Sequence, residues 1–183
     1  VKTRLAHSKI KDWKEWISHL LKQDLANLSI HLRTKTEMSK YPAHYELIPE
    51  IMKLRDELAP NTLITINGDI DDYKKGMELY EKYNVDGIMI GRGVFHNPFA
   101  FDKEMKERTA IEHIELFKYH LDLYDKYTKE EPMLSKPLFR FFKIYIRNIE
   151  GASNLRTSLM DTKSTDEIRK QLNDFMKTKI SQE

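Results

Sequence analysis

Thr62-Leu63-Ile64-Thr65-Ile66-Asn67-Gly68-Asp69 opens the segment that decides the fold, and Gly87-Ile88-Met89-Ile90-Gly91-Arg92-Gly93 closes it. Each of these two stretches begins with a short run rich in β-branched residues and ends in a glycine-bearing turn. A connection of helical length joins them. This pattern is typical of a βαβ unit with parallel strands. The loops after the last two strands of an α/β barrel commonly seat a phosphate, because glycine lets backbone N–H groups approach phosphate oxygens closely. The segment therefore predicts a seat for a cofactor phosphate.

Outward from this segment, strand and helix patterns alternate over the first hundred residues. Further strands are predicted at Val1–Leu5 and Leu28–His31, and helical patterns follow each of them. From Thr109 onward the pattern is helical only. The predicted fold is α/β: residues 1–102 form the C-terminal half of a TIM (β/α)8 barrel, and residues 103–183 form an all-α helical bundle domain. Because Val1 reads as a strand already under way, without an initiator methionine, we interpret the chain as the carboxyl-terminal piece of a longer protein.

Apolar residues at helical spacing predict the buried side of each helix. For the first helix, Asp12 is the expected N-cap, with Glu15 completing a capping box. The expected core residues of the three helices in the first part are Trp13, Trp16, Ile17, Leu20, Leu21, Ile48, Ile51, Met52, Leu58, Tyr73, Met77 and Tyr80.

The composition excludes several classes of protein. Of 183 residues, 40% are hydrophobic and 33% are charged, which is ordinary for a globular protein. No window approaches the roughly 18 to 20 apolar residues needed to span a bilayer. With no cysteine, the chain has no disulfide, thiolate metal site or thiol catalysis of its own. The absence of cysteine and of a targeting signal fits a cytoplasmic protein, and a net charge of +2 does not by itself indicate nucleic acid.

Four predicted strand ends carry polar groups to one side of the sheet: Lys2 with Arg4, His31 with Arg33, the Asn67-Gly68-Asp69 turn and Gly91-Arg92. Each has a plain alternative, since Asn-Gly is a common turn pair, His31 could be a core histidine and Lys2 could be a frayed terminus. Their convergence at the carboxyl ends of parallel strands favours a ligand site. Arg92 adds a fixed positive charge that suits a phosphate.

A basic stripe follows the predicted helix from Lys136 to Ile149. Its members are Lys136, Arg140, Lys143 and Arg147, and Arg156 and Arg169 are candidates to extend it. The stripe is either a solvated helix face or a track for RNA phosphates, where each cation adds sequence-independent affinity. His113 and His120 lie on the preceding helix without a third ligand, so we predict no metal site.

Four motifs, in their order and spacing, resemble those of the tRNA-dihydrouridine synthases. They are Val1-Lys2-x-Arg4-Leu5, His31-x-Arg33-Thr34, Asn67-Gly68-Asp69-Ile70 and Gly87-x-Met89-Ile90-Gly91-Arg92-Gly93-x-x-x-Asn97-Pro98. The resemblance implies an FMN enzyme that reduces the C5=C6 bond of uridines in tRNA, with NADPH re-reducing the flavin. It covers the whole chain, but only the second half of the family's barrel.

The resemblance also implies roles for individual residues. Lys2 and His31 would contact the flavin, while Arg33 and Lys35 would face the RNA. The ribityl chain and phosphate would be held by Asn67, Gly68, Asp69, Gly91 and Arg92. Ala6 and Leu32 depart from the family pattern at the edges of these loops.

The family's catalytic cysteine and first four strands lie upstream of the Val-Lys motif, so we expect this chain alone to be inactive and to bind FMN weakly. We also expect self-association, because a half-barrel exposes two sheet edges. Two alternatives stay open: another phosphate-binding barrel enzyme whose helical tail only packs or dimerises, and an RNA-binding module without chemistry of its own.

Overall fold

The structure is a computed structural model that describes residues 1–104, 106–128 and 136–180, without the side chains at 136, 137, 179 and 180. The chain divides into two compact units, 1–105 and 106–183.

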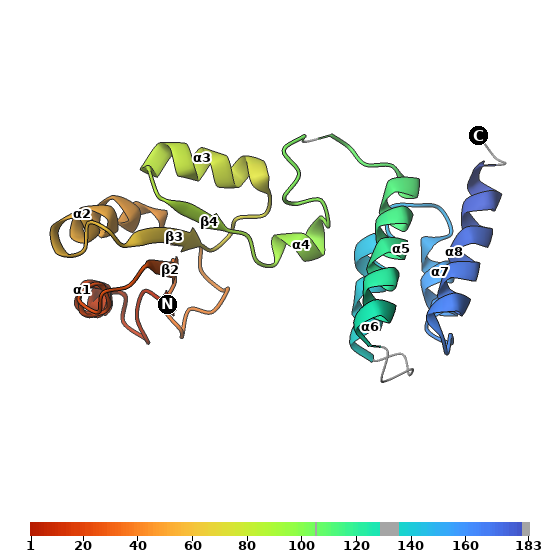
Figure 1. Ribbon diagram of the computed structural model, residues 1–183, viewed down its shortest axis with the longest axis horizontal. Helices are drawn as coiled ribbons and strands as arrows, with labels where there is room; N and C mark the ends of the chain where they lie inside the picture. Colours follow the sequence, from red (N-terminus) through yellow and green to blue (C-terminus); the bar gives the residue numbers. More distant parts are fainter. Residues whose placement is uncertain (105, 129–135, 181–183) are drawn as a thin grey trace. The chain divides into compact units, whose positions relative to one another are not determined.

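The first unit is built on a parallel four-stranded sheet with the strand order β1-β2-β3-β4. The strands are β1 (Lys2–Arg4), β2 (Asn27–His31), β3 (Leu63–Asn67) and β4 (Gly87–Met89). Helices α1 (Trp13–Leu21), α2 (Ile48–Leu58) and α3 (Tyr73–Tyr83) connect them, and α4 (Gly93–His96) follows the last strand. The predicted α/β alternation and the parallel pairing are confirmed (Figure 1).

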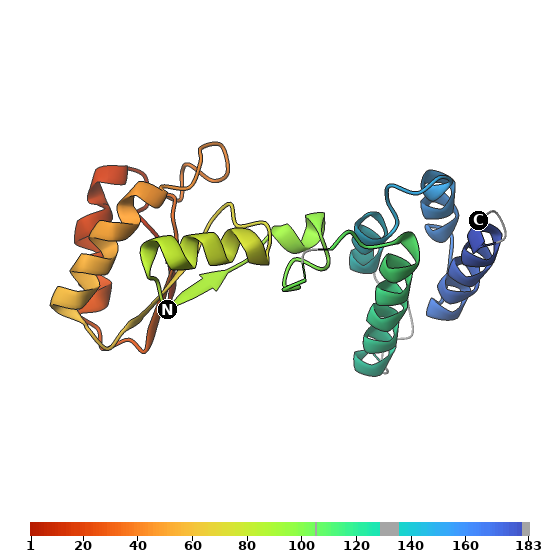
Figure 2. The same ribbon diagram turned by 90° about the horizontal axis from the view of Figure 1, so that it is seen from above.

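The helices cover one face of this sheet. Leu28 and Ile30 of β2, with Ile64 and Ile66 of β3, are fully buried in the core. Residues of α1, α2 and α3 complete the same apolar cluster, and Figure 2 shows α1 and α2 side by side. Since strand residues alternate between faces, Asn27, Ser29, His31, Thr65 and Asn67 point to the opposite face. That face and the carboxyl ends of the strands are where the chain can build a site.

Three predicted core positions are wrong. Trp16 is 42% exposed, Leu58 is 38% exposed and Tyr80 is 40% exposed. The Trp16 indole Nε1 instead donates to the Thr3 hydroxyl at 2.9 Å. In α1 and α2 the predicted stripe is too wide, because residues on its flank or in the last turn lie at the edge of the core. In α3 the stripe is displaced by one position, since the buried residues are Gly76 and Leu79.

Two details of the helices have local causes. Asp12 does not cap α1 with its side chain, because residues Ile10–Asp12 already form a 3-10 turn and Asp12 has helical backbone angles. In α3, Gly76 brings the helix close to the sheet, since an added Cβ would lie 3.0 Å from Cγ2 of Ile88.

The second unit contains α5 (Ala110–Tyr127), α6 (Lys136–Tyr145), α7 (Ala152–Leu159) and α8 (Thr165–Ile180). Its buried cluster draws on all of these helices, with Phe117 and Phe142 among its largest fully buried side chains. A capping box between Thr109 and Glu112 starts α5. α6 is shorter than the predicted Lys136–Ile149 helix. Asn148 has a φ of 56°, which ends helical geometry, and the Arg156 guanidinium donates to the carbonyl of Ile146 at 2.6 Å.

Candidate functional site

The carboxyl ends of the four strands meet at one edge of the first unit, and a hollow of about 500 Å³ lies there. We call it the rim hollow. Seven of the predicted site residues line it, namely His31, Arg33, Asn67, Gly68, Asp69, Gly91 and Arg92. The parallel topology explains this convergence, because each strand delivers its last residues to the same edge.

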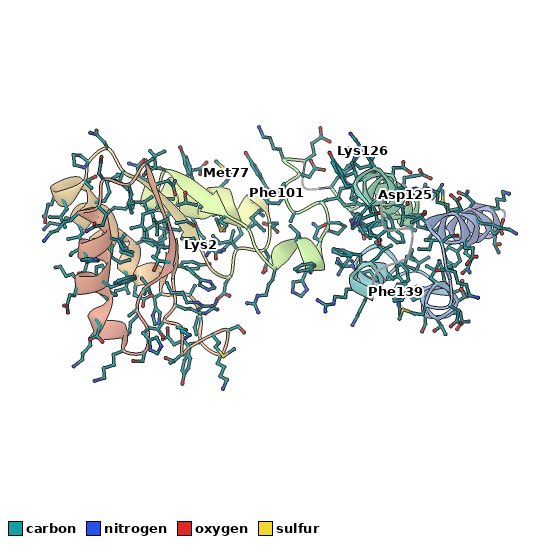
Figure 3. The ribbon with its side chains drawn as sticks, turned by 60° about the horizontal axis from the view of Figure 1, so that its bottom comes forward. Lys2, Met77, Phe101, Asp125, Lys126 and Phe139 are labelled. Atoms are coloured by element: carbon teal, nitrogen blue, oxygen red, sulfur yellow. The ribbon has the colours of Figure 1, made fainter. Side chains whose placement is uncertain are left out.

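Asn67, the last residue of β3, ties neighbouring strands together. Its side-chain amide donates to the carbonyl of Met89 in β4 at 2.8 Å. Its Oδ1 accepts from the Lys2 ammonium at 3.4 Å, so a side chain of β1 (Lys2 is labelled in Figure 3) reaches across to β3. The turn that follows is left-handed at two successive residues, with φ of 125° at Gly68 and 50° at Asp69.

An ion pair between a buried arginine and a partly exposed carboxylate forms one wall of the rim hollow. Arg33 is only 2% exposed, and its guanidinium pairs with the Asp69 carboxylate. It also donates to the carbonyl of Tyr41 at 2.5 Å and lies 3.2 Å from Nε2 of His31. Protein atoms thus engage this guanidinium, which the resemblance assigned to RNA.

The Asp69 carboxylate contacts residues from several segments of the chain. Its Oδ2 accepts from the backbone N–H of Ala43 at 3.0 Å, and its Oδ1 lies 3.9 Å from the Arg92 guanidinium. Burial alone would raise the pKa of Asp69, but the hydrogen bonds from Arg33 and Ala43 outweigh it and lower that pKa. Asp69 is therefore a charged carboxylate that links Arg33 to Arg92.

His31 reports the electrostatic field of the rim hollow. Burial, helped by the positive charges of Arg4, Arg33 and Lys2 and opposed by the Asp69 carboxylate, lowers its pKa to about 4. At neutral pH the imidazole is uncharged. Lys2 also has a lowered pKa, from burial and from Arg4. Burial disfavours any charge here, but the cations that contribute to both shifts show that positive charge is concentrated around the hollow.

The loop after β4 approaches the hollow with its backbone. An added Cβ at Gly93 would lie 2.2 Å from the carbonyl oxygen of Asp71, so this position requires glycine. At Gly91 the nearest atom to an added Cβ would be Nδ2 of Asn67, at 3.7 Å. The N–H groups of Gly91 and Arg92 donate to no acceptor within the part of the chain that the structure describes. Gly91 thus leaves open space beside two free N–H donors.

Arg4, Gly93 and His96 also line the rim hollow. Arg4 was predicted at the converging strand ends but without a ligand role, and Gly93 stands inside a motif. His96, one helical turn after Arg92, has no sequence pattern that predicts it. Lys2 and Lys35 line a neighbouring hollow of about 990 Å³ instead, together with Trp16.

The basic stripe of the second unit has different surroundings. Arg140 and Lys143 are exposed and Arg147 is half-buried, two residues beyond the end of α6. None of the three forms an ion pair with a described residue. The side chain of Lys136 lies outside the described residues.

Arg169 of α8 shows the opposite situation. Its guanidinium lies 2.8 Å from Asp122, 2.6 Å from Asp125 and 3.3 Å from Asp166. Asp125 is labelled on α5 in Figure 3. These carboxylates neutralise Arg169, whereas the stripe keeps its charge.

The described residues contain no group of three or more His, Cys, Asp or Glu side chains arranged to hold a metal ion. Among them, no helix has the length and apolar character to cross a membrane.

Comparison with known proteins gives matches over nearly the whole chain. A family model described as dihydrouridine synthase matches residues 1–181. "Probable tRNA-dihydrouridine synthase 2" of Bacillus subtilis is 63% identical over 175 residues, which are 96% of this chain and 54% of that protein. "Probable tRNA-dihydrouridine synthase" of Staphylococcus aureus is 59% identical and that of Staphylococcus epidermidis 58%, over 96% of this chain and 53% and 54% of those proteins. The chain spans about half the length of these curated relatives.

Proposed function

The chain belongs to the dihydrouridine synthase family, and from this we propose that it forms part of an FMN-dependent, NADPH-driven enzyme that reduces the C5=C6 bond of uridines in tRNA. In this proposal, residues 1–102 are the second half of a TIM barrel and residues 103–183 are a helical tRNA-binding domain. The uninterrupted parallel order of the four strands supports the barrel assignment. A tRNA substrate places the proposed site of action in the cytoplasm.

The convergence of the predicted ligand residues on the rim hollow is the observation that carries this proposal. The hollow suits an anionic group for three reasons. Arg92 offers a guanidinium whose side chain is 65% exposed. The free N–H groups of Gly91 and Arg92 have no side chain at Gly91 in front of them. Arg33 neutralises the carboxylate that would otherwise repel a phosphate. FMN therefore fits the residues present.

Each rim residue has a proposed task. Arg92, Gly91 and Gly68 hold the phosphate, and Asn67 orients the ribityl chain. Lys2 and His31 contact the flavin, where a neutral His31 can donate one hydrogen bond without adding charge. Bound FMN, re-reduced by NADPH, would supply the reducing equivalents for the C5=C6 bond. Arg33 and Asp69 position these groups from behind, and Lys35 extends the site toward the RNA.

The second unit would bind tRNA through Lys136, Arg140, Lys143 and Arg147. Arg140 and Lys143 are exposed and form no ion pair with a described residue, and such cations can neutralise phosphates and release counterions. Arg169 is not part of this proposed surface, since Asp122, Asp125 and Asp166 already surround it.

We further propose that the chain does not turn over on its own and that it self-associates. It contains no cysteine to serve as the general acid that the family resemblance implies. Among the described residues, β1 and β4 each pair with one strand only. The unpaired N–H and C=O groups of such edge strands can pair with a strand of another chain. Light scattering should detect dimers or larger species, and a monomer at high concentration would remove this part of the proposal.

Titration of the 15N-labelled chain with FMN, riboflavin and inorganic phosphate tests the cofactor assignment. We expect weak binding, because the chain supplies half of the proposed pocket, and NMR detects millimolar affinity. FMN and phosphate should shift the amide signals of Gly91 and Arg92, and riboflavin, which lacks the phosphate, should not. Equal shifts with FMN and riboflavin, or no shift with any of the three, would contradict the phosphate site.

A further inference from the structure

The turn after β3 has a backbone that needs support. Gly68 and Asp69 both have positive φ angles. Glycine adopts such angles freely, but Asp69 is an L-residue, and L-residues adopt this conformation rarely, even though aspartate tolerates it better than most. The turn carries the Asp69 carboxylate, which lies between Arg33 and Arg92. Any movement of the turn would therefore move the charges around the rim hollow.

Tyr45 provides this support from the segment that precedes α2. Its hydroxyl donates to the carbonyl of Gly68 at 2.6 Å and lies 3.0 Å from the carbonyl of Asp69. A single phenol thus holds the carbonyls of both left-handed residues. Burial raises the pKa of Tyr45 to about 12, so the hydroxyl keeps its proton at any pH at which the protein is studied.

Other contacts join the same two segments and leave the turn little freedom. Ala43 donates its N–H to Asp69 at 3.0 Å. An added Cβ at Gly68 would lie 3.1 Å from Cβ of Ala43 and 3.3 Å from Cδ2 of His31. The 43–45 segment, the turn and the His31 ring are therefore in mutual contact at the wall of the hollow.

We infer that Tyr45 is a positioning residue of the rim hollow: its hydroxyl clamps the Gly68–Asp69 turn and so fixes where Asp69, Arg92 and the His31 ring lie. Tyr45 does not line the hollow and does not touch a ligand there. The ligand in this inference rests on the proposed function, whereas the clamp itself does not.

Tyr45→Phe tests the clamp because it removes only the hydroxyl. Thr62→Val is the matched control, since Thr62 also donates a buried hydroxyl to a backbone carbonyl, that of Leu25 at 2.7 Å, at the amino end of β3. Tyr41→Phe is a second control, because Tyr41 lies on the same loop with a side chain that is 58% exposed.

Two readouts separate positioning from general stability. In the ligand-free chain, NMR titration of His31 should show its pKa rising by about half a unit or more in Tyr45→Phe, because a loosened turn admits water to the ring. In the same variant, the affinity for inorganic phosphate should fall about tenfold, as expected for a displaced charged donor. Both quantities should stay unchanged in Thr62→Val and Tyr41→Phe, even if Thr62→Val unfolds at lower urea concentration.

An unchanged His31 pKa in Tyr45→Phe would overturn the inference, and so would equal changes in Thr62→Val. If the wild-type chain binds no phosphate while Tyr45→Phe still shifts the His31 pKa, the clamp stands and the proposed phosphate site fails. The two ideas can therefore be rejected separately.

Discussion

The wall of the rim hollow and the basic stripe hold their cations in different ways. In the first unit, Arg33 is buried and held by Asp69, Tyr41 and His31. In the second unit, Arg140 and Lys143 extend into solvent without a described partner. The first arrangement fixes the position of each charge, and the second leaves the charges free to follow a ligand.

This contrast separates two kinds of anion recognition. A fixed set of donors discriminates one anion in one geometry, because the cost of ordering the side chains is met when the protein folds. Mobile surface cations attract any polyanion, and that attraction weakens steeply with salt. A small phosphate-bearing cofactor suits the first unit, and a nucleic acid backbone suits the second.

The largest expected effect comes from removing the partner of the buried arginine. Asp69→Ala leaves the Arg33 side chain, 3% exposed, without its carboxylate. Breaking a buried pair in this way costs about 3 to 5 kcal/mol in the free energy of unfolding. Both tryptophans, Trp13 and Trp16, belong to α1, so fluorescence during urea unfolding reports on the first unit.

Asp125→Ala is the counterpart in the second unit. Arg169 is 23% exposed and keeps Asp122 and Asp166, so the loss should stay below about 1 kcal/mol. Circular dichroism follows this unfolding. Equal losses in the two variants would mean that the two arginine environments do not differ energetically.

The next effect concerns the basic stripe. Replacing Arg140, Lys143 and Arg147 together by alanine should weaken tRNA binding about a hundredfold at about 0.1 M salt, and should reduce the slope of log K against log salt by about 2 to 3. Filter binding at several salt concentrations measures both. Replacing Lys126, Lys163 and Lys170 instead makes the same change in net charge. Comparable losses from that control would show that net charge, and not the stripe, binds the RNA.

A smaller effect is expected at Arg92. Arg92→Ala should reduce the preference for FMN over riboflavin about tenfold, because one charge-assisted hydrogen bond to phosphate is lost. Arg92→Lys keeps the charge but not the two-pronged geometry, so it should fall between the wild type and alanine. Because the side chain is 65% exposed, the urea midpoint should barely change. A preference that survives Arg92→Ala would assign the phosphate to other donors.

Sequence patterns predicted the topology of the sheet but not the hydrogen bonds and ion pairs that hold the site together. β-branched runs and glycine turns predicted the parallel sheet and brought His31, Asn67 and Arg92 to one rim, as the structure has them. Periodicity placed helices correctly but misjudged Trp16 and Tyr80, since the width of a buried stripe depends on what packs against it.

The contacts that hold the site together join residues distant in sequence. Arg33 pairs with Asp69, 36 positions away, and nothing local distinguishes it from the exposed Lys35. Tyr45 had no signal at all, because its role depends on two backbone carbonyls of a turn 23 and 24 positions away. Motifs of a family identify residues near a ligand more readily than residues that position them.

The smallest expected effect is a pH dependence specific to the first unit. His44 lies with Nε2 2.8 Å from Glu37 and Nδ1 2.8 Å from Glu46. An imidazole can donate from both nitrogens only when it is protonated. Burial lowers the pKa of His44, but the hydrogen bonds with both carboxylates outweigh it and raise that pKa above 6.5.

Because the pKa of His44 is higher in the folded protein than in the unfolded chain, its hydrogen bonds with Glu37 and Glu46 stabilise the protein fully below the unfolded pKa near 6.5. This stabilisation disappears as the pH rises through the folded-state pKa. His44→Gln should therefore lower the urea midpoint at pH 5.5 and leave it nearly unchanged at pH 8.5. The loss in the free energy of unfolding at pH 5.5 should stay below about 1 kcal/mol, because the side chains of His44 and its carboxylate partners are partly exposed. His31 acts in the other direction: its pKa of about 4 makes its contribution fade as the pH falls below 6.5. Comparing His44→Gln with the wild type at each pH cancels the contribution of His31. If the variant loses the same stability at both pH values, His44 is neutral in the folded protein.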